Sequence, residues 1–132
     1  MSDEFYICIS GPFGPTYQLD IRNNRVHYSF STLNQITERA QLPELEYQPS
    51  QDDINNFWNV VTTLDIQNWD SEYIHPEILE GPRWEICMRS GEQEKCCLGV
   101  AAFPGSPHPT YSPVFLQLIA AARQVLGWMP FG

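Results

Sequence analysis

The segment 64–84, LDIQNWDSEYIHPEILEGPRW, has the highest density of groups that could take part in chemistry. It contains five carboxylates and one histidine, and its only basic residue is Arg83. Such an unbalanced run of charge is usually a solvated face, and it also has the character of a surface that binds a basic partner. Trp69 and Tyr73 are four residues apart, so a helical turn would place them on one face. The candidate partner-binding residues are Asp65, Asp70, Glu72, Tyr73, Glu77 and Glu80.

The motifs of metal binding and catalysis are missing from the sequence. His75 lies among the acids, but Pro76 follows it, and no expected helix carries a His-x-x-x-His or Glu-x-x-His pair. The segment 11–15, GPFGP, lacks the Lys-Ser/Thr pair of a phosphate loop, and there is no Gly-x-Ser-x-Gly motif. The Pro-x-x-Pro element at 104–107 has no basic residue beside it and reads as a stiff loop. We therefore predict no catalytic residue, no metal and no cofactor.

The four cysteines do not have the Cys-x-x-Cys spacing of a metal or redox site. They fall on expected strands, where a thiol is more often packed than reactive, and we expect all of them to be reduced. A disulfide between Cys8 and Cys87 is the alternative if their strands pair. A pairing of one thiol with His108 also stays open as a catalytic arrangement. The cysteines are Cys8, Cys87, Cys96 and Cys97.

The charge of the chain restricts its partners. The sequence has 132 residues, which fits a single domain over 1–132, and its net charge is −9, from sixteen acidic and seven basic residues. Nucleic acid and anionic membranes need basic residues, so we expect neither as a partner. With no signal segment and no apolar run near 18 residues, we expect a mature, soluble, cytoplasmic protein that is a monomer or a weak homodimer.

The hydrophobic periodicity predicts strands and two helices. Residues 5–10 read as a strand, 17–21 and 26–30 as a hairpin around Asn23-Asn24, and 84–88 and 94–101 as a second hairpin. Ser50 and Ser112 cap helices over 51–64 and 113–126, and 127–132 form a tail that docks through Trp128 and Phe131. Residues 33–41 are a short helix or a loop, and 45–48 a further possible strand.

These elements predict an α+β fold in the order β-β-β-α-β-β-α. We expect an antiparallel sheet of about five strands with two amphipathic helices packed on one face.

Three short motifs give the chain a resemblance to known sequences: Trp69-x3-Tyr73, Glu80-Gly81-x2-Trp84, and Gly99-x-Ala101-Ala102-x-Pro104. Over residues 50–126 the sequence resembles a group of small uncharacterised bacterial proteins, with Glu80 where that group has Asp. The group has no established activity. In size and charge it is similar to immunity proteins, which neutralise toxins encoded beside them.

Our leading hypothesis is therefore a non-enzymatic interaction protein of the bacterial cytoplasm, an immunity or inhibitor protein whose acidic segment 65–80 covers a basic partner surface. The first alternative is a small-molecule-binding or enzymatic domain. Its pocket would lie between sheet and helices, lined by Tyr17, Tyr28, Trp84 and His27. The second alternative is an assembly module that self-associates through the apolar tail 128–131.

Overall fold

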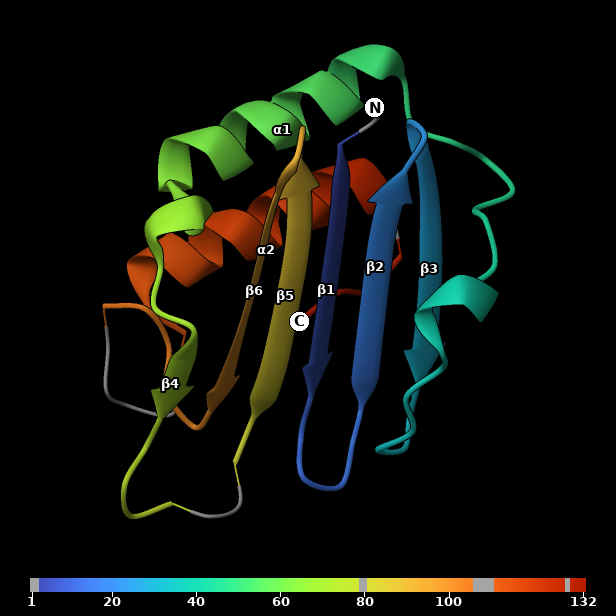
Figure 1. Ribbon diagram of the computed structural model, residues 1–132. Coiled ribbons are helices and arrows are strands. Elements are labelled where there is room, and N and C mark those ends of the chain that lie inside the picture. The colour runs from blue at the N-terminus through green and yellow to red at the C-terminus, as the bar shows by residue number, and fades with distance from the viewer. Residues whose placement is uncertain (1–2, 79–80, 106–110, 128) are drawn as a thin grey trace.

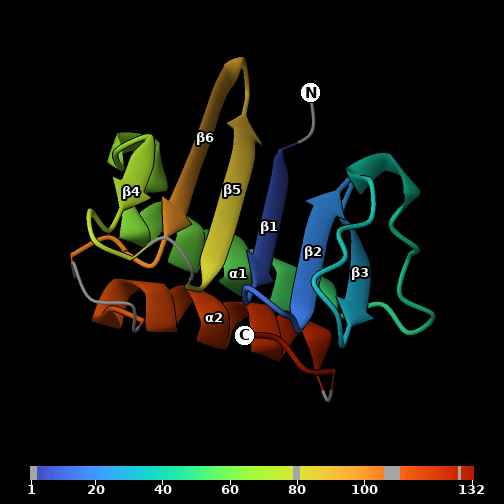
Figure 2. The same ribbon diagram turned by 90° about the horizontal axis from the view of Figure 1, so that it is seen from below.

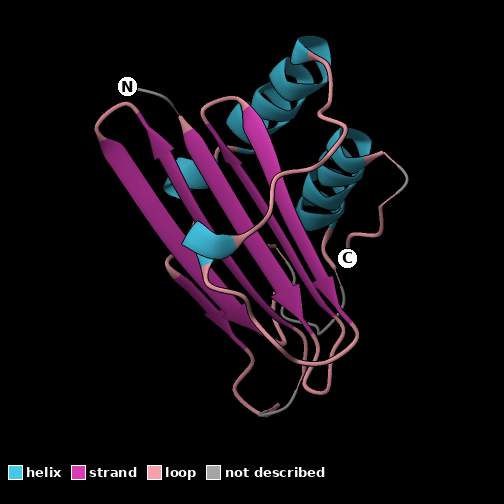
Figure 3. Cartoon of the chain, turned by 90° about the vertical axis from the view of Figure 1, so that its right-hand side faces the viewer, coloured by secondary structure: helices cyan, strands magenta, loops and turns pink. Residues whose placement is uncertain are grey.

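The computed structural model describes residues 3–78, 81–105, 111–127 and 129–132, and it confirms the α+β class. Six strands form one sheet in the order β3-β2-β1-β5-β6-β4. Helices α1 (Gln51–Leu64) and α2 (Pro113–Leu126) both lie on one side of this sheet (Figures 1 and 3). The strands are β1 (Glu4–Ser10), β2 (Thr16–Arg22), β3 (Arg25–Ser31), β4 (Glu72–Ile74), β5 (Arg83–Ser90) and β6 (Gln93–Val100).

Local signals set most of these elements. Asn23 and Asn24 both have left-handed backbone, with φ of 54° and 58°, as a two-residue turn between twisted strands requires. The hydroxyl of Ser50 accepts a hydrogen bond from the backbone N–H of Asp53, and that of Ser112 accepts one from Phe115, so each caps its helix. The hairpins and both helices therefore lie where the sequence pattern places them.

The prediction of about five antiparallel strands is wrong, because β4 is a sixth strand that pairs in parallel with β6. After α1 ends at Leu64, a short 3₁₀ turn (Ile66–Asn68) leads into extended chain instead of the helical turn proposed for residues 69–73. Ser71 accepts a hydrogen bond from the backbone N–H of Leu98, and His75 donates one to Val100. The order is therefore β-β-β-α-β-β-β-α, and the added strand is too short for its periodicity to be visible.

Described residues of all three sequence motifs pack together on the helix side of the sheet, where the rings of Trp69 and Tyr73 lie 6.4 and 5.8 Å from that of Trp84. Trp84 lies directly opposite Gly99 in the β5–β6 register, and its indole N–H donates a hydrogen bond of 2.9 Å to the carbonyl of Ala102. A Cβ atom at Gly99 would stand 2.0 Å from the indole nitrogen, and one at Gly81 would stand 2.8 Å from the Cβ of Ala101. These residues pack the core, because only glycine leaves room for the indole and for Ala101.

The prediction of four free thiols is also wrong, because Cys87 and Cys96 face each other across β5 and β6 and form a disulfide. Cys8 and Cys97 are free and buried. The alternative pair of Cys8 with Cys87 fails on register: β1 does pair with β5, but Cys8 lies opposite Glu85, and Cys87 opposite Tyr6.

The C-terminal tail is part of the core. Phe131 is 1% exposed and lies against the ring of Tyr17, and the hydroxyl of Tyr28 donates a hydrogen bond to the carbonyl of Pro130. Arg123 donates to the carbonyls of Phe131 at 2.7 Å and of Gly132 at 3.1 Å. The docking through Phe131 is therefore confirmed, while Trp128 lies outside the described residues.

Candidate interaction surface

The side of the sheet that faces away from the helices carries ordered rows of side chains. Inward residues of β5 such as Trp84 and Ile86 face the helices, so Arg83, Glu85 and Cys87 between them face outward. The strand registers extend these outward positions into two rows across β1, β5, β6 and β4. The first row is Ser10, Arg83, Val100 and Ile74, and the second is Cys8, Glu85, Leu98 and Glu72. We call these two rows the open face.

Residues 32–42, here called the strap, cover the outward side of β2 (Figure 2). The hydroxyl of Thr16 donates to the carbonyl of Leu33 at 2.8 Å. Gln18 exchanges two hydrogen bonds with the backbone of Thr37, at 2.7 and 2.8 Å. These outward polar side chains satisfy backbone N–H and C=O groups of the strap that would otherwise need a neighbouring strand. The strap therefore stays in place although its only regular element is a 3₁₀ turn, Arg39–Gln41.

An ion pair fixes the end of the strap. The carboxylate of Asp20 is 0% exposed and receives two hydrogen bonds from Arg39, at 2.9 and 3.0 Å, and one from Arg22 at 3.1 Å. A bidentate pair with a buried carboxylate is among the stronger polar contacts in a protein. The strap therefore forms a wall beside the open face.

The segment after the strap covers the edge of β3. Leu45 donates its backbone N–H to the carbonyl of Val26, and the Gln48 side chain bonds both backbone groups of Val26, at 2.8 and 3.0 Å. The possible strand at 45–48 is therefore not formed, because a side chain takes the place of the next ladder contact.

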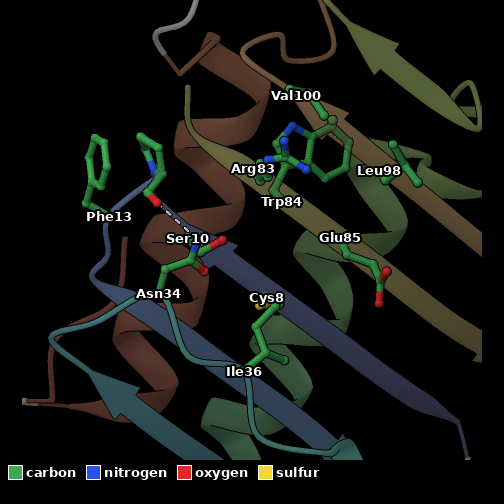
Figure 4. A pocket seen from close by; sticks show the side chains of 12 residues that line it. Cys8, Ser10, Phe13, Asn34, Ile36, Arg83, Trp84, Glu85, Leu98 and Val100 are labelled. Carbon is green, nitrogen blue, oxygen red and sulfur yellow. Dashed lines mark hydrogen bonds between the residues drawn. The ribbon is translucent and has the colours of Figure 1, made fainter. Parts of the chain in front are cut away.

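A hollow of about 500 Å³ lies between the open face, the strap and the β1–β2 turn (Figure 4). Three large apolar side chains around it are exposed to solvent: Phe13 by 80%, Ile36 by 61% and Leu98 by 37%. In Figure 4, Phe13 and Leu98 stand on opposite sides, with Arg83 and Ser10 between them. Because exposed apolar groups that gather in one place mark binding sites, this hollow is the main candidate.

The hollow also holds polar groups of both kinds. Glu85 supplies a carboxylate, and Arg83 a guanidinium for which the described residues provide no ion-pair partner. Burial raises the pKa of the Cys8 thiol to about 11. Cys8 is therefore protonated at neutral pH, and a thiol is a weaker nucleophile than a thiolate.

The basic residues are nearly all engaged within the protein, so its free surface charge is acidic. Four of the seven basic residues form ion pairs with carboxylates, and Arg123 binds the tail carbonyls. The paired bases are Arg22, Arg25, Arg39 and Arg89. Their partners are four of the sixteen acids, Asp20, Glu44, Glu4 and Glu94.

The predicted partner-binding residues divide between the open face and the neighbouring β4 edge. Glu72 is exposed and belongs to the second row of the open face, beside Leu98. Asp70 and Glu77 are exposed close by in the chain, and Asp65 ends α1 and accepts hydrogen bonds from the Asn68 amide.

Two further predicted residues differ from these exposed acids. Tyr73 is half-buried, with its ring 5.8 Å from that of Trp84 and its hydroxyl accepting from the backbone N–H of Asp70. Burial raises the pKa of Tyr73. Its contacts are those of a core residue. Glu80 lies outside the described residues.

A second, smaller hollow of about 370 Å³ lies at the β4 edge, lined in part by Glu72, Tyr73, His75 and Phe103. The Nδ1 atom of His75 accepts a hydrogen bond of 3.1 Å from the backbone N–H of Glu77. Within the described ranges, no three His, Cys, Asp or Glu side chains come close enough to hold a metal ion. The thiol–histidine pairing with His108 falls on a residue that the structure does not describe.

The residues around the main hollow were missed by sequence reasoning. Phe13 and Ile36 stand in loops, where an exposed apolar residue is the only available signal, and no pattern connects them to Leu98. Arg83 and Glu85 alternate with buried Trp84, which marks them as outward but not as lining a hollow.

Comparison of the sequence with models of known protein families gives no match, and comparison with curated proteins gives none either. Among the described residues, neither of the two helices has the length and apolar character needed to cross a membrane.

Proposed function

We propose that this chain is a non-enzymatic acidic binding protein, most concretely an immunity or inhibitor protein that covers a basic surface of a toxin or effector. The observation that carries the proposal is the gathering of Phe13, Ile36 and Leu98, all exposed, around one hollow beside Glu85. Binding sites in proteins combine an apolar centre with a charged rim.

The charge distribution favours a basic partner. Most bases are engaged by the protein's own acids or carbonyls, while Glu72, Glu85, Asp70 and Glu77 are exposed on or near the open face. Opposite charges on the two surfaces would speed association and would exclude acidic competitors. Asp70, Glu72 and Glu77 are not among the residues that line the hollow, so they can meet the partner at the rim without losing all contact with water.

The location that we propose is the bacterial cytoplasm, where an immunity protein would meet its toxin. The Cys87–Cys96 disulfide is the feature that favours an oxidising compartment instead, since structural disulfides are rare in the cytosol. A count of free thiols in protein taken directly from its host, alkylated before lysis, separates the two locations.

The test measures binding of this protein to a purified soluble partner. That partner is the product of the neighbouring gene, if that product is basic. Leu98→Asp places a charge in the centre of the open face and should weaken binding at least about tenfold, a loss typical of a central apolar contact. Leu116→Asp is the matched control, because Leu116 is 51% exposed on α2 at the opposite side of the sheet. Equal binding by both variants would place the partner elsewhere.

The acids are tested by reversing their charge. A triple change to Lys at Asp70, Glu72 and Glu77 should abolish binding with no loss of folding, because all three side chains are exposed. A control with the same net charge changes three exposed acids away from the open face to Lys, and its binding should fall only through long-range attraction. The control positions are Glu46, Asp52 and Glu92.

The alternative function is binding of a small molecule, and the volume of the main hollow supports it. About 500 Å³ lies within the usual range of ligand pockets. The hollow is on the opposite side of the sheet from the pocket expected between sheet and helices. Of the residues named for that pocket, Trp84 lines this hollow, whereas Tyr28 belongs to the core. Self-association through the tail loses support, because Phe131 is buried within its own chain.

A further inference from the structure

The polar floor of the main hollow is built to receive an anion, although the protein as a whole is acidic. Ser10 and Arg83 lie directly opposite each other on β1 and β5, and both line the hollow. Ser10 is only 4% exposed, and the described hydrogen bonds include none to its hydroxyl. Its Oγ is not among the enclosed polar atoms that lack a partner, so it is reached by solvent from the hollow and can donate to a ligand there.

Arg83 differs from the other arginines of the chain. The other five arginines hold carboxylates or the tail carbonyls, whereas the described residues offer Arg83 no acceptor. A guanidinium forms its best contact as a two-point fork with a carboxylate. Arg83 and Ser10 together therefore provide a donor set that fits one carboxylate.

The walls above these donors are apolar. Phe13, Ile36 and Leu98 surround the same space and are exposed to solvent. A ligand that satisfies both the floor and the walls carries a carboxylate and an apolar group close together. Aspartate and glutamate side chains within a polypeptide lack the apolar group, whereas a C-terminal Leu, Ile, Val or Phe has both on one residue.

We propose that the hollow binds the C-terminal residue of the basic partner. Its carboxylate contacts Arg83 and Ser10, its apolar side chain lies among Phe13, Ile36 and Leu98, and Glu85 faces a Lys or Arg of the preceding residues. This inference rests on the proposed function, because it takes the open face as the surface that meets the partner. The inference adds to the proposed function the segment of the partner that enters the hollow, which is its C-terminal residue.

The probes are two peptides of one sequence, Ac-Gly-Ser-Gly-Lys-Ser-Leu, one ending in a free carboxylate and the other in an amide. Binding is followed by changes in the backbone NMR signals of the isotope-labelled protein up to millimolar peptide. The free acid should bind at least about tenfold more tightly than the amide, since a charged hydrogen bond is lost in the amide. Perturbed signals should lie in the β1–β2 turn, the strap, β5 and β6.

Two variants assign the carboxylate contact. Arg83→Met keeps an unbranched stem without the charge, and it should remove the preference for the acid over the amide. Arg25→Met is the control, because Arg25 pairs with the exposed Glu44 at the end of β3 and should leave the preference unchanged. Equal binding of acid and amide to the wild-type protein, or no binding of either, overturns the inference.

Free leucine separates the two sources of such a carboxylate. It should bind at least about tenfold more weakly than the peptide, because it lacks the Lys that faces Glu85. If leucine binds as tightly as the peptide, the ligand is a small molecule and the inference of a chain end is wrong. The proposed function is judged by a separate result. If a basic partner binds the wild-type protein but not Leu98→Asp, that function is supported even when the two peptides bind equally.

Discussion

The contact between Trp84 and Gly99 provides the sharpest test of the fold, through Gly99→Ala. The added Cβ would stand 2.0 Å from the indole nitrogen, 2.3 Å from Cε2 and 2.7 Å from the carbonyl oxygen of Ala102. The indole must move, and with it goes the buried hydrogen bond to Ala102. Overpacking costs about 1–3 kcal/mol and an unsatisfied buried polar group about 1–3 kcal/mol, so we expect a loss of about 2–6 kcal/mol.

Urea unfolding at neutral pH measures this loss as a lower midpoint with an unchanged slope. For a domain of this size, 1 kcal/mol corresponds to about 4 °C, so the melting temperature should fall by about 8–24 °C. Trp84→Phe supplies the second variant, because a smaller ring without the N–H leaves room beside residue 99. In that background Gly99→Ala should cost less than about half as much.

Two results would refute this reasoning. A cost of Gly99→Ala below about 0.5 kcal/mol would mean that the indole moves freely, contrary to its burial at 3% exposure. Additive costs of the two changes would mean that Gly99 is needed for its own backbone and not for Trp84.

Three further predictions concern the strap and the cysteines. Asp20→Asn removes the charge that Arg39 and Arg22 contact; the strap should detach locally and expose its amides to hydrogen exchange, and unchanged protection would contradict its role. Reduction of the Cys87–Cys96 disulfide, which closes a short loop, should cost about 2–3 kcal/mol in urea unfolding, and four free thiols in the untreated protein would disprove the bond. Burial raises the pKa of Cys8 and Cys97 to about 11, so between about pH 9 and 11 these thiols stay protonated in the folded protein while those of the unfolded chain ionise. The free energy of unfolding should therefore fall over this range by about 1.4 kcal/mol per pH unit for each thiol. A variant with both cysteines replaced by Ala should show a smaller fall.

The parts of the fold that the sequence predicts are those with local signals. Alternation around Asn23-Asn24 predicts a hairpin, and serine caps followed by apolar stripes predict both helices, because these patterns depend on neighbours within a few residues. Strand β4 depends instead on a parallel contact with β6, and three residues carry no usable period. To predict the Cys87–Cys96 disulfide one must know the register of β5 against β6. Alternation of polar and apolar residues shows which side a residue faces, but it does not fix that register.

The candidate surface was less predictable than the fold, for a related reason. Alternation shows that Gln18 and Asp20 face away from the helices, and an outward polar residue is normally solvated. Here both are buried beneath the strap, which their side chains hold in place. The sequence therefore predicts the direction of these side chains but not their environment, and the wall of the hollow could not be inferred.

The alternation of β5 separates stability from binding. Trp84 and Ile86 face the helices, while Arg83 and Glu85 face the open side, one residue away along the same strand. Substitutions at the two outward positions change no buried contact with the helices, so they should move the melting temperature by less than about 2 °C. Gly99→Ala should do the reverse, by weakening the fold while the charges of the open face stay the same. A variant of Arg83 that loses ligand and stability together would show that the hollow belongs to the core, and the proposed surface would then be wrong.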